Sequence, residues 1–338
     1  MKVAINTRPL DGPWGGGNRF VQSLAETLQH RGHQVAFELD DRVDLALIID
    51  PRRRNPQLSF TPGQAMAQQR RHPELLIVHR INECDERKGT STINARLRWA
   101  NYCADHTVFI ASWLRDLDLW RRESDATVIL NGADERIFRR GSARTWDVGE
   151  PLRIVTHHWG AHANKGWDVY RKVDALAGEA AWRDRIHLTC IGNLPADVTL
   201  ANSTRMPPLD GAALAAALAD HHVYLSASVN EPAGMHHIEG ALVGLPLIYR
   251  RSGALPEYCE GYGEPFDGPS DVAAALTRML ASYPGWKRRM AAYPHTAERM
   301  SHRYVDLFER LHADRSGIAA RRRPWRAPVT AMLARISP

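Results

Sequence analysis

The sequence predicts an α/β fold made of two parallel sheets, each covered by helices on both faces. The chain has 338 residues, and a domain takes roughly 150, so this length fits about two domains. Short apolar runs alternate with stretches of helical periodicity in two successive series. Because strands that alternate with helices form parallel sheets, each series predicts one sheet.

Each predicted strand is a short run rich in Val, Ile and Leu, as is typical of strands covered on both faces. Between the runs, Phe20, Leu24 and Leu28 share one stripe of a predicted helix, and residues 210–220 follow the same period. The runs of the first series are Val3–Asn6, Gln34–Leu39, Leu45–Ile49, Leu75–Val78, Thr107–Ile110 and Thr127–Leu130, and those of the second are Arg153–Thr156, Ile186–Ile191, Val223–Ala227 and Pro246–Tyr249.

The polar segment Phe138–Pro151 predicts the junction between the two domains, because it contains glycine and proline and lacks apolar periodicity. We therefore place an N-terminal domain at residues 1–145 and a C-terminal domain at residues 146–300. Residues 301–338 are predicted to form a helix that returns to the N-terminal domain, followed by a basic tail.

Composition excludes several classes of protein. Hydrophobic residues make up 44% of the chain and charged residues 24%, which is typical of a folded globular protein and unlike a disordered one. No apolar run approaches the ~20 residues of a membrane-spanning helix, and the N-terminus has no segment typical of a signal peptide. The four cysteines form no CxxC pair, which predicts reduced thiols in a cytoplasmic protein.

The net charge of +6 suits an anionic ligand, an anionic membrane face or nucleic acid. Over a chain of this length the excess is modest, so a mildly basic enzyme is the simpler interpretation. Part of this positive charge lies in the tail, in the basic segment Arg321–Arg326, which also contains Trp325. This tail is either a disordered terminus or a peripheral contact with the inner, anionic face of a membrane.

Ligands of open parallel sheets lie beyond the carboxyl ends of the strands, so the loops after strands are the places to look for chemistry. The first strand is followed by three glycines, Gly15–Gly17, then by Asn18, Arg19 and a predicted helix. Glycines let backbone amides approach an anion at a helix N-terminus. The spacing matches neither a Walker loop nor GxGxxG, and a turn capped by Asn18 is the alternative.

Ionisable residues also follow two later strands. His79 and Arg80 come after Leu75–Val78, where a histidine could move a proton near neutral pH, although a solvated charged loop is the alternative. Lys165 lies between the strand Arg153–Thr156 and a predicted helix, a position from which lysine binds phosphate. Three histidines precede it, but their spacing matches no metal motif, so no metal site is predicted.

Two glutamates flank the start of a predicted helix. Glu231 lies in the loop after Val223–Ala227, and Glu239 follows after seven intervening residues. Gly234 and Met235 would begin the helix, so their amides would attract a diphosphate. Glu231 could accept hydrogen bonds from sugar hydroxyls and Glu239 from a ribose. The alternative is an acidic cap followed by a glutamate on the helix surface.

These segments together resemble the nucleotide-sugar-dependent glycosyltransferases of the GT-B fold, most closely family 4. The resemblance covers most of the chain and is most specific in its second half. It includes the glycine loop and the motifs Asn131–Phe138, Asn164-Lys165-Gly166, Glu231 to Glu239 and Ser252–Glu257.

The resemblance implies two Rossmann-like domains facing across a cleft, with the acceptor on the first and the donor mainly on the second. By analogy, Glu231 would hold the hydroxyls of the donor sugar and Glu239 the ribose. Lys165 would contact the diphosphate, together with Gly234 and Met235. Gly16 and Gly17 would approach the diphosphate and acceptor from the other domain, and His79 matches the family's histidine beside the reacting sugar. Enzymes of this family retain anomeric configuration and need no divalent metal or other cofactor.

One departure concerns the diphosphate. The family usually has an arginine shortly before the lysine, whereas no arginine lies between Arg153 and Lys165 here. We expect the second cation to come from His158, Arg19 or Arg80.

The sequence therefore predicts a retaining transferase that moves a hexosyl unit from a nucleoside diphosphate sugar to a hydroxyl of a glycan, a lipid-linked sugar or a small natural product, as in polysaccharide biosynthesis. An epimerase or phosphorylase on the same fold is the alternative within enzymes. A basic protein that binds nucleic acid or membranes without catalysis is the other. It is disfavoured because aromatic and basic residues do not interleave outside the tail, and no nucleic-acid partner is predicted.

Overall fold

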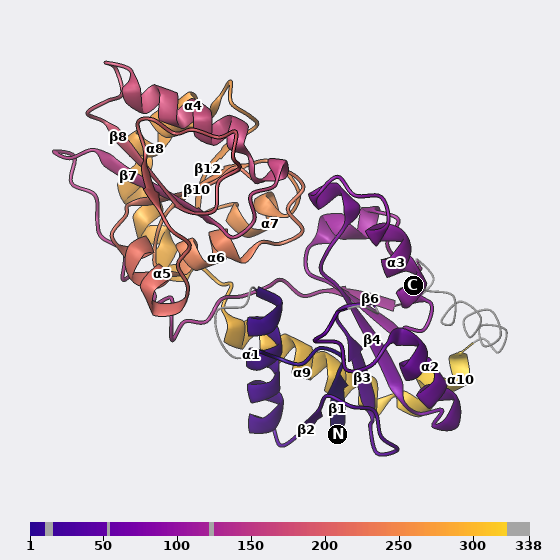
Figure 1. Cartoon of the computed structure of the whole chain (residues 1–338). Helices are drawn as coiled ribbons and strands as arrows, with labels where there is room; N and C mark the ends of the chain where they lie inside the picture. The colour runs from indigo at the N-terminus through magenta and orange to yellow at the C-terminus, as the bar shows by residue number, and fades with distance from the viewer. Residues whose placement is uncertain (11–15, 53–54, 122–124, 323–338) are drawn as a thin grey trace. The chain divides into compact units, whose positions relative to one another are not determined.

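The computed structural model describes residues 1–10, 16–52, 55–121 and 125–322, and the chain forms two compact units (Figure 1). The first unit comprises Met1–Asn131 and the chain from Ala297 onward, and the second comprises Gly132–Thr296. The observed division therefore lies earlier along the chain than the predicted boundary after residue 145. The polar segment 138–151 packs within the second unit, where the amides of Ala143 and Arg144 donate to the carbonyls of Val243 and Ala219.

The first unit is built on a six-stranded sheet in which every described pair of strands is parallel. Its strand order is β2-β1-β3-β4-β5-β6, so the chain reverses its direction of winding between β1 and β3. The strands are β1 (Lys2–Ile5), β2 (Gln34–Ala36), β3 (Leu45–Ile48), β4 (Leu76–Ile81), β5 (His106–Phe109) and β6 (Asp125–Val128).

Helices cover both faces of this sheet. On one face, α1 (Gly16–His30) and α9 (Ala297–Ala313) bury their apolar stripes against the strands, and Phe20 packs edge-on against Tyr304. The other face is covered by α2 (Pro62–Arg71), where Ala65 of the helix and Phe60 just before it pack against the strands. The remaining helices of the unit are η1 (Asp85–Arg87), α3 (Ile93–Asn101), η2 (Ser112–Asp116) and α10 (Arg315–Arg321).

The second unit has a six-stranded sheet of its own, with parallel pairing throughout and the order β12-β11-β10-β7-β8-β9. When the six strands are numbered along the chain, this is the strand order of a Rossmann domain. The winding of such a domain reverses between its first and fourth strands, which are β7 and β10 here. The predicted pair of parallel sheets is therefore confirmed. The strands are β7 (Leu152–His158), β8 (Ile186–Gly192), β9 (Thr204–Met206), β10 (Val223–Ser226), β11 (Leu247–Arg250) and β12 (Gly263–Phe266).

One large hydrophobic core of the second unit joins its sheet to two of its helices. Helices α4 and α8 pack against the sheet, and their buried side chains, such as Tyr170 and Met279, join those of the strands. The helices are η3 (Ala163–Lys165), α4 (Trp167–Gly178), α5 (Gly211–Ala219), α6 (Met235–Leu242), α7 (Leu255–Cys259), α8 (Val272–Arg289) and η4 (Met290–Ala292). Within the described residues of the whole chain, no helix is both long enough and apolar enough to cross a bilayer.

Candidate functional site

The switch point of the second sheet gathers most of the residues that the sequence singled out. Lys165 follows β7, and Glu231 follows β10, the neighbouring strand on which the winding reverses. Glu239 lies on α6, the helix after β10. Because the carboxyl ends of adjacent parallel strands meet at one edge, these three side chains can converge although they are far apart in the sequence.

Lys165 and Glu231 form a buried ion pair. The Lys165 ammonium Nζ lies 2.8 Å from Oε2 of Glu231, and both side chains are almost entirely buried. Gly166 permits this approach, because its φ of 87° is left-handed and a Cβ there would lie 2.1 Å from the carbonyl oxygen of Ala227. The Val229 amide also donates to the Asn164 carbonyl at 2.8 Å. The loop that carries Lys165 is thus held against the loop that carries Glu231.

Glu239 forms a second buried polar contact beside the first. Its Oε2 lies 2.9 Å from Nε2 of His157, and Nδ1 of that histidine lies 3.1 Å from the Tyr224 hydroxyl. A carboxylate only accepts hydrogen bonds, so His157 donates to Glu239 through Nε2. Neither His157 nor Tyr224 lies in one of the family motifs, so roles for these two residues could not be predicted from the sequence.

His158 does not supply the expected second cation. It belongs to β7, and its Nε2 accepts a hydrogen bond from the Tyr170 hydroxyl at 2.8 Å, which itself accepts from Thr156 and from the Ala227 amide. Burial, followed by the nearby Lys165 charge, lowers the pKa of His158 well below its usual value. Burial and the hydrogen bond with Tyr170 both disfavour a charged imidazole, so the structure does not support His158 as the cation that would bind phosphate.

The loop before α6 packs closely against the loop that carries Gly253 and Ala254. Gly234 caps the helix, which begins at Met235, as the sequence predicted. The Ala254 amide donates to the Glu231 carbonyl at 2.9 Å, and Gly253, with φ of 57°, lies so close that a Cβ would be 2.6 Å from the Glu231 backbone. The first amides of an α-helix have no partners within the helix, so this end of α6 presents positive dipoles beside Glu231.

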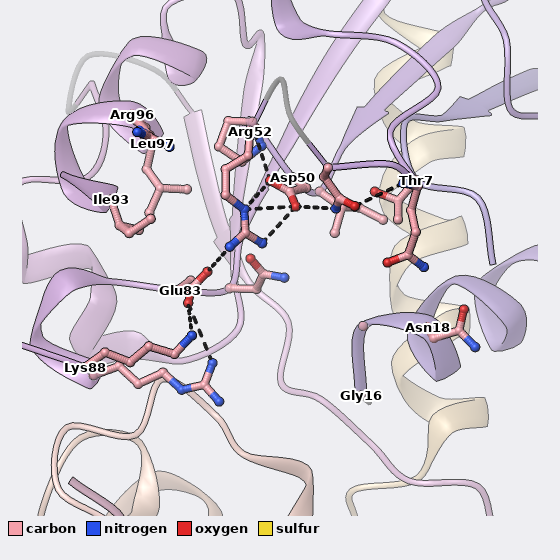
Figure 2. Close-up of a pocket in the computed structure, with 17 residues that line it drawn as sticks. Thr7, Gly16, Asn18, Asp50, Arg52, Glu83, Lys88, Ile93, Arg96 and Leu97 are labelled. Atoms are coloured by element: carbon pink, nitrogen blue, oxygen red, sulfur yellow. Dashed lines mark hydrogen bonds and ion pairs between the residues drawn. The ribbon is translucent and has the colours of Figure 1, made fainter. Parts of the chain in front are cut away.

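Gly16 and Gly17 lie in the first unit and line a pocket of about 330 Å³ there (Figure 2). Helix α1 begins at Gly16, and the preceding residues 11–15 fall outside the described part of the chain. Asn18 does not cap the helix but lies within it, and its amide group exchanges two hydrogen bonds with the backbone of Leu10. Arg19 lies in the first turn of α1 and is not among the residues that line this pocket.

His79 and Arg80 lie inside the first unit instead of at the open end of its sheet. Strand β4 does not end at Val78 but continues to Ile81, and His79 pairs with Thr107 of β5. The His79 side chain is fully buried, with Nδ1 3.2 Å from the amide nitrogen of Asn101, and burial lowers its pKa to about 3. The prediction that it lies beside a reacting sugar in the cleft is therefore wrong.

Arg80 points to the opposite face of the sheet from His79, because successive side chains of a strand alternate. Its guanidinium donates to the Tyr304 hydroxyl at 3.1 Å and to Asn131 Oδ1 at 2.8 Å, and it lies 3.9 Å from the centre of the Phe20 ring. Only 2% of the residue is exposed. Arg80 therefore anchors α1 and α9 to the sheet, and the prediction that it contacts phosphate is wrong.

A metal centre was considered because histidines are frequent near Lys165. Among the residues that the structure describes, no group of three or more histidine, cysteine, aspartate or glutamate side chains is arranged to hold a metal ion. The positive groups at the switch point are the Lys165 ammonium and the amides that begin α6.

The two doubly wound parallel sheets match the GT-B fold that the sequence predicts, and solved structures of glycosyltransferases share this architecture. The match to sucrose-phosphate synthase from Thermosynechococcus elongatus spans 93% of this chain and 99% of the synthase chain, with 15% identity and a TM-score of 0.61. The match to HepE of Anabaena in complex with UDP spans 92% of this chain and 100% of HepE, with 12% identity and a TM-score of 0.64. The match to WaaG, a glycosyltransferase involved in lipopolysaccharide biosynthesis, spans 91% of this chain and 99% of WaaG, with 14% identity and a TM-score of 0.60.

These likenesses establish the shared fold. No protein-family model matches the chain, and no curated protein matches it in sequence.

Proposed function

We propose that this chain is a retaining glycosyltransferase that moves a hexosyl unit from a nucleoside diphosphate sugar to a hydroxyl acceptor. The observation that carries the proposal is the buried Lys165–Glu231 pair at the switch point of the second sheet, beside the start of α6. Two structures of one neighbour lend support, because HepE of Anabaena was solved with UDP and with UDP-glucose.

Each group at the switch point matches one part of such a donor. The Lys165 ammonium and the first amides of α6 are positive and suit the diphosphate. The Glu231 carboxylate suits the sugar hydroxyls, and Glu239 suits the ribose hydroxyls, since carboxylates accept strong hydrogen bonds. Lys165 and Glu231 neutralise each other, and a donor that brings both an anion and hydroxyl groups offers a partner to each of them.

The reaction follows from these roles. The bond between the anomeric carbon and the diphosphate oxygen breaks, and the acceptor oxygen bonds to the same carbon from the same face. The acceptor proton passes to the departing diphosphate, and the nucleoside diphosphate leaves. Lys165 and the α6 amides stabilise the negative charge that grows on the leaving group. We propose that they do so without a divalent metal.

The Glu231→Gln variant tests the assignment. Glutamine keeps the size of the side chain and still accepts from Lys165, but it leaves the buried ammonium without a counter-charge, so we expect a lower melting temperature in a chain that still folds. Glutamine accepts sugar hydroxyls more weakly, and a misplaced sugar costs about 100-fold in turnover. Transfer from UDP-sugars, with EDTA present, is measured by the release of UDP and of the glycoside.

Glu260→Gln is the matched control, because Glu260 is exposed at the end of α7 in the same unit. It should transfer at the wild-type rate. Wild-type turnover by Glu231→Gln would contradict the site. Release of free sugar alone, or a requirement for inorganic phosphate, would favour an epimerase or a phosphorylase over a transferase.

Donor binding is tested separately by thermal shift. A nucleoside diphosphate sugar at about 100 times its dissociation constant should add ~2.7 kcal/mol to the stability of the folded chain. The panel compares UDP, GDP and ADP with their sugars. A chain that none of them stabilises would contradict the proposed function.

A further inference from the structure

The pocket of the first unit lies at the switch point of its own sheet. The winding reverses between β1 and β3, and residues that follow β1, β3 and β4 line the cavity. Ile93, Arg96 and Leu97 of α3 form one side, and Thr7, Gly16 and Asn18 form the other (Figure 2). A volume of about 330 Å³ is at the small end of ligand pockets and suits a monosaccharide-sized group.

Cations outnumber carboxylates in this pocket. The lining includes four basic side chains, Arg52, Arg87, Lys88 and Arg96, against two acidic ones, Asp50 and Glu83, which leaves a net charge of 4 − 2 = +2. All six of these residues belong to the first unit, so the excess is a property of the first unit itself.

Asp50 is already satisfied by its neighbours. Arg52 contacts its carboxylate through Nε at 2.9 Å and Nη2 at 2.8 Å, and Asn55 donates to it at 2.7 Å. The Arg52 and Asn55 hydrogen bonds hold the pKa of Asp50 below its usual value in spite of burial, so it stays ionised. Asp50 thus orients Arg52 at the wall of the pocket.

Glu83 faces three cations at once. Its carboxylate lies 3.2 Å from Nζ of Lys88, 3.4 Å from Nη1 of Arg52 and 4.0 Å from Nη1 of Arg87, and Figure 2 shows it between Arg52 and Lys88. Because Arg52 is also paired with Asp50, Glu83 is left to Lys88 as its nearest cation. Lys88 and Arg52 remain 45% and 42% exposed, so they can turn toward an incoming anion without losing Glu83.

Groups that bind uncharged hydroxyls lie beside the cations. The side chains of Arg96 and Asn82 have no hydrogen-bond or ion-pair partner within the part of the chain that the structure describes. Further amides and a hydroxyl come from Asn55, Gln57 and Thr7. Apolar contacts are provided by Ile49, Pro51, Ile93 and Leu97. Amides, a hydroxyl and an apolar face together suit a sugar ring.

We propose that this pocket binds an acidic sugar, a hydroxyl-bearing ring that carries a carboxylate or a phosphate. The inference rests on the proposed function in one respect, which is that the bound sugar is the acceptor of the transferred hexose. A neutral sugar would leave the Arg96 guanidinium without a charged partner, whereas an oxyanion on the ring gives Arg96 such a partner and gives Lys88 a second one beside Glu83.

Binding to the full chain tests this proposal, with four small probes: glucose, glucuronate, glucose 6-phosphate and inorganic phosphate. Calorimetry or ligand-observed NMR at low salt gives the dissociation constants. We expect at least one acidic sugar to bind roughly tenfold or more tightly than glucose, as a charge-assisted hydrogen bond implies. The comparison of glucuronate with glucose 6-phosphate distinguishes a carboxylate from a phosphate. Tighter binding of inorganic phosphate than of either acidic sugar would overturn the sugar assignment.

Arg96→Gln, alone and combined with Lys88→Gln, tests the cations. Each change should weaken binding of the acidic sugar by roughly tenfold and leave glucose unaffected. Arg98→Gln is the matched control, because Arg98 lies on the same helix, outside the pocket, and pairs with Asp118. Equal affinity for glucose and both acidic sugars would overturn the proposal, as would wild-type affinity in the double variant.

The donor site provides the readout that separates the two proposals. Affinity for the nucleoside diphosphate sugar should be the same in the wild type and in Arg96→Gln. Binding of acidic sugars without any binding of nucleotide sugars would contradict the proposed function and leave the acidic-sugar site standing. Nucleotide-sugar turnover with no preference for an acidic acceptor would contradict the acidic-sugar site alone.

Discussion

At the scale of single residues, Gly166 determines how closely the loop of Lys165 approaches the end of β10. Gly166→Ala would place a Cβ 2.1 Å from the Ala227 carbonyl oxygen at a φ of 87°. We expect the variant to lose about 2–4 kcal/mol of stability, since both the strained φ and the clash must be relieved. Urea denaturation followed by circular dichroism measures this loss.

Gly17→Ala is the contrasting variant for the first unit. Among the residues that the structure describes, nothing lies within 4 Å of the Cβ that it would add, and alanine is favoured over glycine within a helix by about 0.5–1 kcal/mol. We therefore expect unchanged or higher stability. If Gly17 approaches the diphosphate and acceptor as predicted, turnover falls while the fold is intact, and wild-type turnover would remove Gly17 from the site.

At the scale of elements, α9 completes the core of the first unit although it is encoded after the whole of the second. Phe308 is fully buried there, among the side chains of α1 and the sheet. Phe308→Ala should cost about 3–5 kcal/mol. Hydrogen exchange should show faster opening of β1 and β3, with protection in β7 and β10 preserved.

Glu298→Ala is the control for this variant, because Glu298 lies on the same helix and its side chain is 77% exposed. It should change stability by less than about 0.5 kcal/mol. Equal loss of protection in both units after Phe308→Ala would contradict the assignment of α9 to the first unit alone.

Strand positions could be predicted from the sequence where both faces are apolar, and could not where they are polar. The runs that became β3 and β10 were found because their residues are buried on both faces. The edge strands β9 and β12 were missed, because Thr204–Met206 has little apolar character and Gly263–Phe266 contains a proline, which edge strands tolerate.

The same dependence on apolar residues explains why the two strands that carry candidate site residues were predicted too short. The end of an apolar run was taken as the end of the strand, yet β4 continues through His79 and Arg80 and β7 through His158. These polar side chains find partners inside the protein, namely Asn101, Tyr304 and Tyr170. Such partners come from distant elements and cannot be read from local sequence. The Lys165–Glu231 convergence was predictable, because the strand order of a doubly wound sheet brings both loops to one edge.

At the scale of the whole molecule, buried neutral histidines make the fold sensitive to acid. Burial lowers the pKa of His79 and His237 to about 3 and of His106 and His222 to about 4. In the unfolded chain these groups titrate near 6.5. Between pH 6.5 and about 4 the unfolded state therefore binds protons that the folded state does not, so stability falls as the pH falls. Each histidine that stays neutral removes up to ~2 kcal/mol at pH 5.

The midpoint of urea unfolding should accordingly fall steeply between pH 7 and pH 5, and His237→Phe should flatten that dependence. His237 is fully buried between the rings of His236 and Tyr258, and neither ring nitrogen has a hydrogen-bond partner among the described residues. Phenylalanine fills the same space and binds no proton, so the variant should gain stability relative to the wild type at pH 5 and less at pH 7. His302→Phe is the control, because the His302 side chain on α9 is 44% exposed, and it should alter the dependence less than His237→Phe does. A wild-type midpoint that is equal at pH 5 and pH 7 would show that these histidines titrate normally in the folded protein.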